Sequence, residues 1–314
     1  MQLAEALDYS RPRIHEFIRL SGQVIVGKSQ QLKLSLACLL AEGHLLIEDV
    51  PGVGKTTLVR FLSKALGLQE SRIQFTNDLL PSDILGTSIF DKASQKFTFH
   101  PGPIFSQLVL GDELNRATPK TQSACLQAME EARVTVDGVT HELPRPFFVI
   151  ATQNPEEQLG TYPLPESQLD RFLMRIELGF PDRENERLLL TGERRDVMIS
   201  EMKSVMSPED LLSLQKQVRQ VHTSDALIQY VQDILTNSRD HSERYRGLSP
   251  RAGLALLSAS RAWAFIEGRD MVLPEDVQAV APSALGHRLN HFGDSSYRAG
   301  VARVTELLRS VRVD

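Results

Sequence analysis

The sequence predicts an α/β protein in which a doubly wound, mostly parallel sheet is followed by a smaller all-helical domain. Before Phe180, short apolar runs alternate with helical patterns, an order typical of parallel strands joined by helices. One of these runs leads into a glycine-rich stretch, residues 50–57, and then into a helix. After Pro181 the strand patterns end and helix starts accumulate.

The first elements are a helix, a strand and a second helix. Residues 28–41 carry leucines at helical spacing and are closed by Gly43. The continuous apolar run at residues 44–48 predicts a buried strand. The helix after the glycine-rich stretch ends at Gly67, and its apolar face consists of Leu58, Phe61, Leu62 and Leu66.

Later apolar runs continue the alternation, and two segments interrupt it. Residues 88–105 alternate in polarity, and residues 133–143 contain a hairpin around Asp137 and Gly138. Both are interpreted as insertions that project from the core. The remaining predicted elements are strands at 73–75, 108–110, 147–151 and 173–178 and a helix at 118–132.

The length of 314 residues suggests two domains. We place the boundary near residue 182, so that residues 1–182 form the α/β core with its two insertions and residues 183–314 form the helical domain. Proline or acidic residues in a first turn predict helix starts at Ser207, Ser249 and Leu273.

Composition excludes several classes of protein. A formal net charge of -5, without any block of five or six like charges, argues against a nucleic-acid partner. No run of 18 apolar residues occurs and the first residues do not resemble a leader, so we expect no membrane span and a cytoplasmic protein. Cys38 and Cys125 lie in apolar helical patterns, which predicts free buried thiols.

The glycine-rich stretch has the composition of a phosphate-binding loop. Glycines let backbone N–H groups approach a phosphate, a lysine contacts the terminal phosphates, and a hydroxyl supplies a magnesium ligand. The complete pattern has a glycine where this chain has Asp49, whose carboxylate must point away from the phosphates or be paired. The expected nucleotide-binding residues are Pro51, Gly52, Val53, Gly54, Lys55, Thr56 and Thr57, with Thr56 also on the metal.

Two further strands end in polar residues that would face the same phosphates. Asp112 and Glu113 follow one apolar run, at the carboxyl end of a strand where ligands of open α/β sheets bind. We expect Asp112 to hold hydrated Mg²⁺ and Glu113 to polarise the attacking water, unless the pair is only a solvated acidic turn. Asn154 ends the next strand and would hydrogen-bond the γ-phosphate or the water, although an Asn-Pro pair is more often a turn.

These motifs carry a resemblance to the MoxR-type AAA+ ATPases. The matching stretches are Val26 with Gly27 and residues 48–56, 112–122, 151–155, 164–172 and 249–252. The resemblance implies a P-loop NTPase core of the AAA+ type with a helical lid, and ATP and Mg²⁺ as ligands. It also implies that Asp49 belongs to the family's own form of the loop, and that the two insertions are the helix-2 insert and the pre-sensor hairpin of one AAA+ branch.

The resemblance further implies roles for three residues. Asn154 corresponds to the first sensor, and Arg171 to the arginine finger that reaches a neighbouring subunit's nucleotide. Arg251 corresponds to the second sensor, on the γ-phosphate of its own subunit. The alternatives that remain open are Arg116 or Arg183 as the finger, a salt bridge of Arg171 with Asp170 or Glu166, and a plain surface arginine at position 251.

The leading interpretation is a magnesium-dependent ATPase that works as a homo-oligomeric, hexameric ring and remodels a protein client or inserts its cofactor. The resemblance implies a partner that contains a von Willebrand factor A domain. The alternatives are a nucleic-acid motor, a chelatase-like subunit, or a module that binds nucleotide without hydrolysing it. The hairpin at residues 133–140 offers one arginine and no lysine, which argues against the motor, and Glu113 favours hydrolysis.

Overall fold

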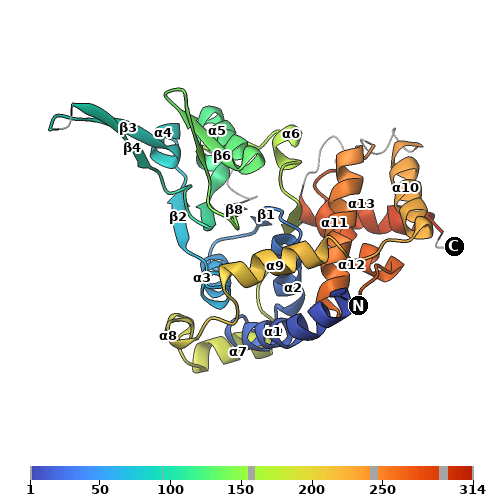
Figure 1. The fold of residues 1–314 in the computed structure, drawn as a ribbon. Helices are drawn as coiled ribbons and strands as arrows, with labels where there is room; N and C mark the ends of the chain where they lie inside the picture. The colour runs from blue at the N-terminus through green and yellow to red at the C-terminus, as the bar shows by residue number, and fades with distance from the viewer. Residues whose placement is uncertain (1, 94, 155–159, 241–246, 290–295, 313–314) are drawn as a thin grey trace.

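A five-stranded parallel sheet organises the first half of the chain (Figure 1). The computed structural model describes residues 2–93, 95–154, 160–240, 247–289 and 296–312. Every pairing in this sheet is parallel, so the carboxyl ends of all strands lie at one edge. The strands, in spatial order, are β2 (Glu70–Gln74), β5 (Leu108–Asp112), β8 (Phe148–Gln153), β1 (Leu45–Glu48) and β9 (Met174–Ile176).

The central strands are buried on both faces, as the continuous apolar runs predict. Leu45 and Ile47 face one apolar cluster and Leu46 faces another, because successive side chains of a strand point to opposite sides. Helices cover both faces and confirm the doubly wound α/β fold. They are α1 (Gln2–Val24), α2 (Ser29–Leu40), α3 (Lys55–Ala65), α4 (Pro81–Leu85), α5 (Pro119–Glu131) and α6 (Glu166–Leu169), with a 3₁₀ turn, η1, at Leu114–Arg116.

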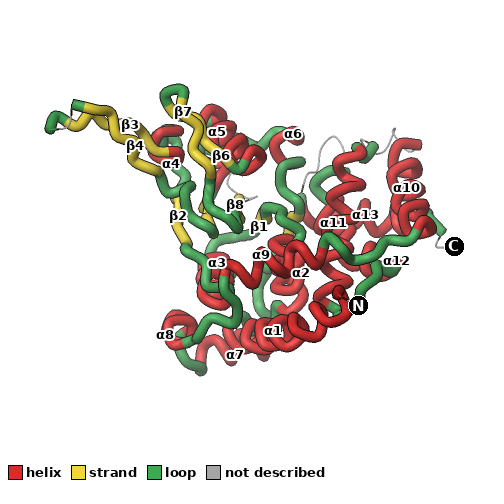
Figure 2. Tube along the Cα trace, in the orientation of Figure 1, coloured by secondary structure: helices red, strands yellow, loops and turns green. Residues whose placement is uncertain are grey.

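Two antiparallel hairpins occupy the segments interpreted as insertions. In the hairpin of β6 (Arg133–Val136) and β7 (Val139–Glu142), Asp137 and Gly138 have φ values of 50° and 79°, as a two-residue turn of the mirror-image type requires. The hairpin of β3 (Gly86–Asp91) and β4 (Lys96–Pro101) projects furthest from the body of the molecule (Figure 2).

The second half of the chain is helical, as predicted. Its helices are α7 (Arg183–Thr191), α8 (Arg195–Glu201), α9 (Pro208–Val218), α10 (Asp225–Asp240), α11 (Pro250–Ile266), α12 (Pro274–Leu285) and α13 (Tyr297–Ser310). One apolar cluster runs without a break from the sheet through α2 to α9, α11 and α12. Near α8, Val205 and Met206 donate backbone hydrogen bonds to Ala65 O at the end of α3. The boundary at residue 182 therefore stays a prediction, because packing continues across it.

Two expectations about single features can be compared with the structure. Cys38 and Cys125 are free and buried, as predicted, and burial raises the pKa of Cys125 to about 12. No helix among the residues described is both long and apolar enough to cross a bilayer.

Candidate functional site

The loop between β1 and α3 is shaped to surround an anion. Gly52 and Gly54 have φ values of 86° and 99°, which side chains rarely adopt. A Cβ placed on either glycine would meet no other atom within 4 Å, so the space beside the loop is open. Helix α3 begins at Lys55, and the N–H groups of its first turn have no partner within the helix. Backbone donors and the helix dipole therefore favour a phosphate at this loop.

Lys55 is held at the mouth of this loop. Its Nζ donates to Asp49 O at 2.8 Å, which keeps the ammonium beside the glycines. Partial burial lowers the pKa of Lys55, and the carboxylates of Asp112, Asp49 and Glu113 oppose that shift. A cation surrounded by carboxylates at a phosphate-binding loop is arranged to bind a triphosphate together with its metal.

The carboxylate of Asp49 points away from the loop opening. Its Oδ2 accepts from the backbone N–H groups of Leu178 and Gly179 at 2.7 and 2.6 Å, and its Oδ1 accepts from Val50 N at 2.9 Å. This pairing resolves the departure from the complete phosphate-loop pattern, because the negative charge is satisfied by three backbone donors.

A buried ion pair that the sequence patterns do not indicate lies behind the loop. Glu48 is 5% exposed and Arg175 is 1% exposed, and their charged groups are 3.2 Å apart. The other oxygen of Glu48 accepts from Tyr297 N at 2.9 Å, so the first turn of α13 is joined to β1 immediately before Asp49. Gln153 Nε2 also donates to Glu48, at 2.6 Å.

Asp112, the residue expected to hold the metal, ends β5. Its Oδ1 accepts from Thr152 Oγ1 at 2.7 Å and its Oδ2 binds Arg72 at 2.7 Å. Thr56 and Arg72 share a cavity of about 140 Å³ close to this position. Among the residues described, no group of three His, Cys, Asp or Glu side chains could enclose a metal. The hydroxyl of Thr56 and the carboxylate of Asp112 fit Mg²⁺, which is usually held by one or two protein oxygens together with phosphates and water.

Glu113 follows directly in a left-handed conformation, with φ of 57°. Its Oε2 accepts from Gln74 Nε2 at 3.0 Å and from Arg116 at 3.1 Å. Its backbone N–H donates to Thr152 Oγ1 at 2.9 Å, so one threonine orients both adjacent acids. Arg116, a rival finger, thus pairs with the acid of its own chain. Gln74 and Thr152 were not predicted, although both lie at the ends of strands that the sequence indicates.

Asn154 lies at the same edge of the sheet. It is 7% exposed, and its carbonyl oxygen is 3.5 Å from Asn115 Nδ2. The carboxyl edge thus brings together the loop, Lys55, Asp112, Glu113 and Asn154.

Arg171 and Arg251 lie at the opposite edge. Arg171 Nε is 3.0 Å from Glu130 Oε2, and one terminal nitrogen of Arg251 is 3.2 Å from Glu130 Oε1. His44 immediately precedes β1 and therefore marks the amino end of that strand. Its Nε2 donates to Met129 O at 3.0 Å, and its carbonyl oxygen accepts from Leu173 N. The residues beside Glu130 and Arg171 therefore contact the amino end of β1.

About 10 Å of strand β1 separates this edge from the loop, at about 3.3 Å per residue. Arg171 therefore lies away from its own loop, and its role as a finger stays a prediction. Arg251 lies beside it, and not beside its own loop as the resemblance implied. Arg183, the other rival finger, is exposed at the start of α7.

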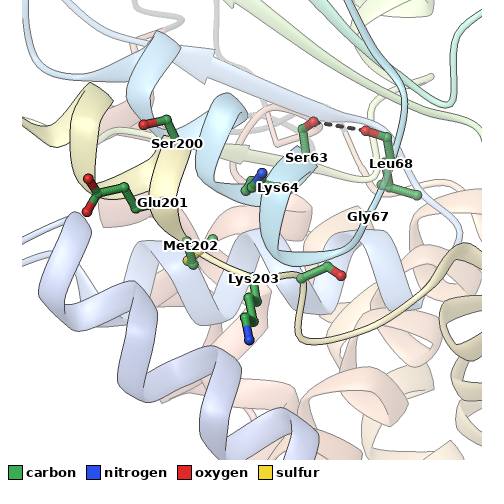
Figure 3. A pocket seen from close by; sticks show the side chains of 9 residues that line it. Ser63, Lys64, Gly67, Leu68, Ser200, Glu201, Met202 and Lys203 are labelled. Atoms are coloured by element: carbon green, nitrogen blue, oxygen red, sulfur yellow. Dashed lines mark hydrogen bonds between the residues drawn. The ribbon is translucent and has the colours of Figure 1, made fainter.

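A separate hollow lies elsewhere on the described surface. Its volume is about 740 Å³, and Lys64, Gly67, Met202 and Lys203 are among the residues that line it (Figure 3). These residues surround the end of α3, about 15 Å along the helix from Lys55. The hollow is thus separate from the loop.

Comparisons with known proteins agree with this geometry. Residues 44–174 match the family described as "ATPase family associated with various cellular activities (AAA)", and residues 236–307 match the AAA lid domain. YeaC of Bacillus subtilis (strain 168), an uncharacterized protein, is 45% identical over 304 residues, 96% of this chain and 95% of that protein. Chaperone MoxR1 of Mycobacterium tuberculosis is 42% identical over 276 residues, 85% of this chain and 73% of that protein.

The chain belongs to the MoxR-type AAA ATPase family. A crystal structure from Cytophaga hutchinsonii, described as a candidate ATPase, shares 37% identity with a TM-score of 0.86 and covers 99% of this chain and 97% of that one. The family resemblance and the α/β core with a helical lid are thereby confirmed. The MoxR-type loop of this chain keeps Lys55 and Thr56 and turns Asp49 backward onto the residues that follow β9.

Proposed function

We propose that this MoxR-type protein hydrolyses ATP with Mg²⁺ in a ring of identical subunits and uses the energy to remodel a protein client or insert its cofactor. The observation that carries the proposal is the convergence of Lys55, Asp112 and Glu113 beside the open glycine loop. Acids of this kind beside a phosphate-binding lysine have a direct use in phosphoryl transfer.

Each of these residues has a distinct role in the proposal. The backbone of residues 51–57 and Lys55 would bind the phosphates, and Thr56 and Asp112 would hold the metal, partly through water. The metal supplies charge neutralisation on the phosphates. Glu113, oriented by Gln74 and Thr152, would accept a hydrogen bond from the attacking water. Asn154 would contact the water or the γ-phosphate from the end of β8.

The placement of the arginines supports a ring. Phosphoryl transfer is accelerated by an arginine that neutralises charge in the transition state. Arg171 and Arg251 lie at the edge opposite their own loop, so we assign both of them to the nucleotide of a neighbouring subunit. A contact between the loop edge of one copy and the arginine edge of the next is head-to-tail, and such contacts form a ring when the rotation between copies closes. We propose six subunits.

The client and its location form the finer part of the proposal. One relative is named a chaperone, which supports a protein as the object of the work. The family resemblance supports a partner with a von Willebrand factor A domain and a cytoplasmic site of action. The net charge of -5 supports a protein partner over a nucleic acid.

A Glu113→Gln variant tests the hydrolytic part. We expect phosphate release to fall at least about a hundredfold, within the usual effect of a general base, while a fluorescent nucleotide binds as to the wild type. Glu142→Gln, an exposed change on β7, is the matched control and should keep wild-type turnover. Unchanged phosphate release in Glu113→Gln would contradict the role of Glu113, and nucleotide binding by the wild type without phosphate release would support a nucleotide-gated binding module instead. Salt-dependent retention of the wild type on single-stranded DNA would support a nucleic-acid motor.

A further inference from the structure

Glu130 holds two arginines at once. It lies near the end of α5, and each of its carboxylate oxygens binds a different guanidinium, Arg171 at 3.0 Å and Arg251 at 3.2 Å. The side chains of Glu130, Arg171 and Arg251 are 40%, 26% and 50% exposed, so the three groups face solvent together. The two arginines come from different halves of the chain, and Glu130 brings them to one point.

The neighbouring acid serves a different arginine. Asp170 Oδ1 binds Arg288 at 2.6 Å, and the side chain of Arg288 is only 6% exposed. The other N–H groups of Arg288 donate to carbonyls of Asp170, Phe172 and Leu173 at 3.0, 2.9 and 3.1 Å. Asp170 reaches Arg251 only at 3.5 Å. Asp170 is therefore committed to fixing the segment that carries Arg171, and Glu130 binds both solvent-facing arginines.

Glu130 and Asp170 bind three guanidinium groups at this edge, and the carboxylate of Glu131 attracts Arg171 electrostatically. Two arginines without a shared partner would repel each other and sample many rotamers. Exposed ion pairs are weak, so a more highly charged anion can take over both arginines. Leu254, one turn beyond Arg251 on α11, is 70% exposed, so this face also presents apolar surface.

We propose that Glu130 is a positioning residue that gathers Arg171 and Arg251 into one pair and presents this pair to the triphosphate bound by the neighbouring subunit. The inference rests on the proposed function and adds a residue to it. Glu130 itself does not touch nucleotide. It acts in the subunit that supplies the arginines, and not in the subunit that binds the ATP which is hydrolysed.

This direction can be tested in mixed assemblies purified through two different affinity tags. One subunit type carries Lys55→Ala and supplies arginines without binding ATP productively. The other carries Arg171→Ala and Arg251→Ala and binds ATP without supplying arginines. We expect neither type to be active alone. The mixture should regain turnover at the contacts where a subunit of the second type binds ATP and a neighbouring subunit of the first type supplies the arginines. Glu130→Ala is then placed in one type at a time.

We expect Glu130→Ala in the arginine-supplying subunit to lower kcat roughly tenfold with little change in KM, within the effect of misplacing a catalytic group. In the ATP-binding subunit the same change should have no effect. Equal losses in both arms, or a gain in the first, would overturn the role of Glu130 while leaving the shared site intact. No turnover in the confirmed mixture would overturn the proposed function and this inference with it.

Two further variants separate positioning from folding. Glu142→Gln in the arginine-supplying subunit is the matched control, because Glu142 is exposed on β7, and turnover should be unchanged. Glu130→Asp in the same subunit keeps the charge and should restore at least half of the turnover lost in Glu130→Ala. If Glu130→Asp turned over no faster than Glu130→Ala, the need for a carboxylate at this position would be contradicted.

Discussion

His44 should make the stability of the protein depend on pH between about 6.5 and 4. Its ring is buried at the amino end of β1, where Nε2 donates to Met129 O and Nδ1 accepts from Val149 N at 3.1 Å. The contact with Val149 requires the neutral ring, because Nδ1 can accept a hydrogen bond only when it carries no proton. Burial lowers the pKa of His44 from 6.5 to about 4, so the folded state binds its proton less readily than the unfolded chain does.

The magnitude follows from that shift. The stabilising effect of a lowered pKa is complete above the unfolded value and is lost as pH falls toward the folded value. A shift from 6.5 to about 4 corresponds to about 3 kcal/mol in total, of which about 2 kcal/mol should be lost between pH 7.5 and pH 5. The pKa of His287 is lowered in the same direction by its burial, so His287 contributes a slope of the same sign.

Urea unfolding of wild type and His44→Asn over pH 5 to 7.5 isolates the effect of His44. The asparagine variant loses a buried contact and should be less stable at pH 7.5 by about 1–3 kcal/mol. Between pH 7.5 and 5 the wild type should lose about 2 kcal/mol more than the variant does, because His287 and the acids are common to both. Parallel stability curves for the two proteins would refute the assignment of a neutral, proton-resistant His44.

Two other substitutions probe the carboxyl edge. Glu48→Ala leaves the buried guanidinium of Arg175 without its carboxylate and should lower the free energy of unfolding by about 3–5 kcal/mol in urea titrations. The control is Glu177→Ala, which should cost less than about 1 kcal/mol because its partner Arg298 is exposed. Similar losses in the two variants would mean that the buried pair is weak. Lys55→Ala should weaken nucleotide binding roughly 10- to 100-fold in a fluorescent nucleotide titration, because a charged hydrogen bond is lost. Lys64 is exposed on the same helix, so the control variant Lys64→Ala should bind nucleotide as the wild type does. Equal affinities for the two lysine variants would contradict the role of Lys55.

The fold could be predicted because the central strands have simple patterns. Strands β1, β5 and β8 are buried on both faces and read as continuous apolar runs. Strand β2 was predicted only at residues 73–75, whereas it spans Glu70–Gln74, because it is an edge strand with polar residues at its start. The boundary at residue 182 cannot be read from composition, since apolar packing continues from the sheet into the lid.

The functional residues at the carboxyl edge of the sheet are easier to predict from the sequence than those at the amino edge. Residues at the carboxyl edge lie within short motifs at the ends of strands, so spacing alone indicates their chemistry. At the amino edge, Arg251 and Glu130 are 121 residues apart, and only the folded chain brings them together. The resemblance supplied Arg171 and Arg251, but it gave no sign of Glu130, and it implied an own-subunit role for Arg251 that the observed position does not favour.

The bond from Tyr297 N to Glu48 connects positions 249 residues apart and has a consequence for biosynthesis. The strand that leads into the glycine loop is finished only when the last helix of the chain has been made and has docked. Contacts of such long range form slowly, and the partly made chain exposes apolar surface in the meantime. A chain truncated before residue 297 would therefore contain the first strand, but its buried acid Glu48 would lack one of its donors.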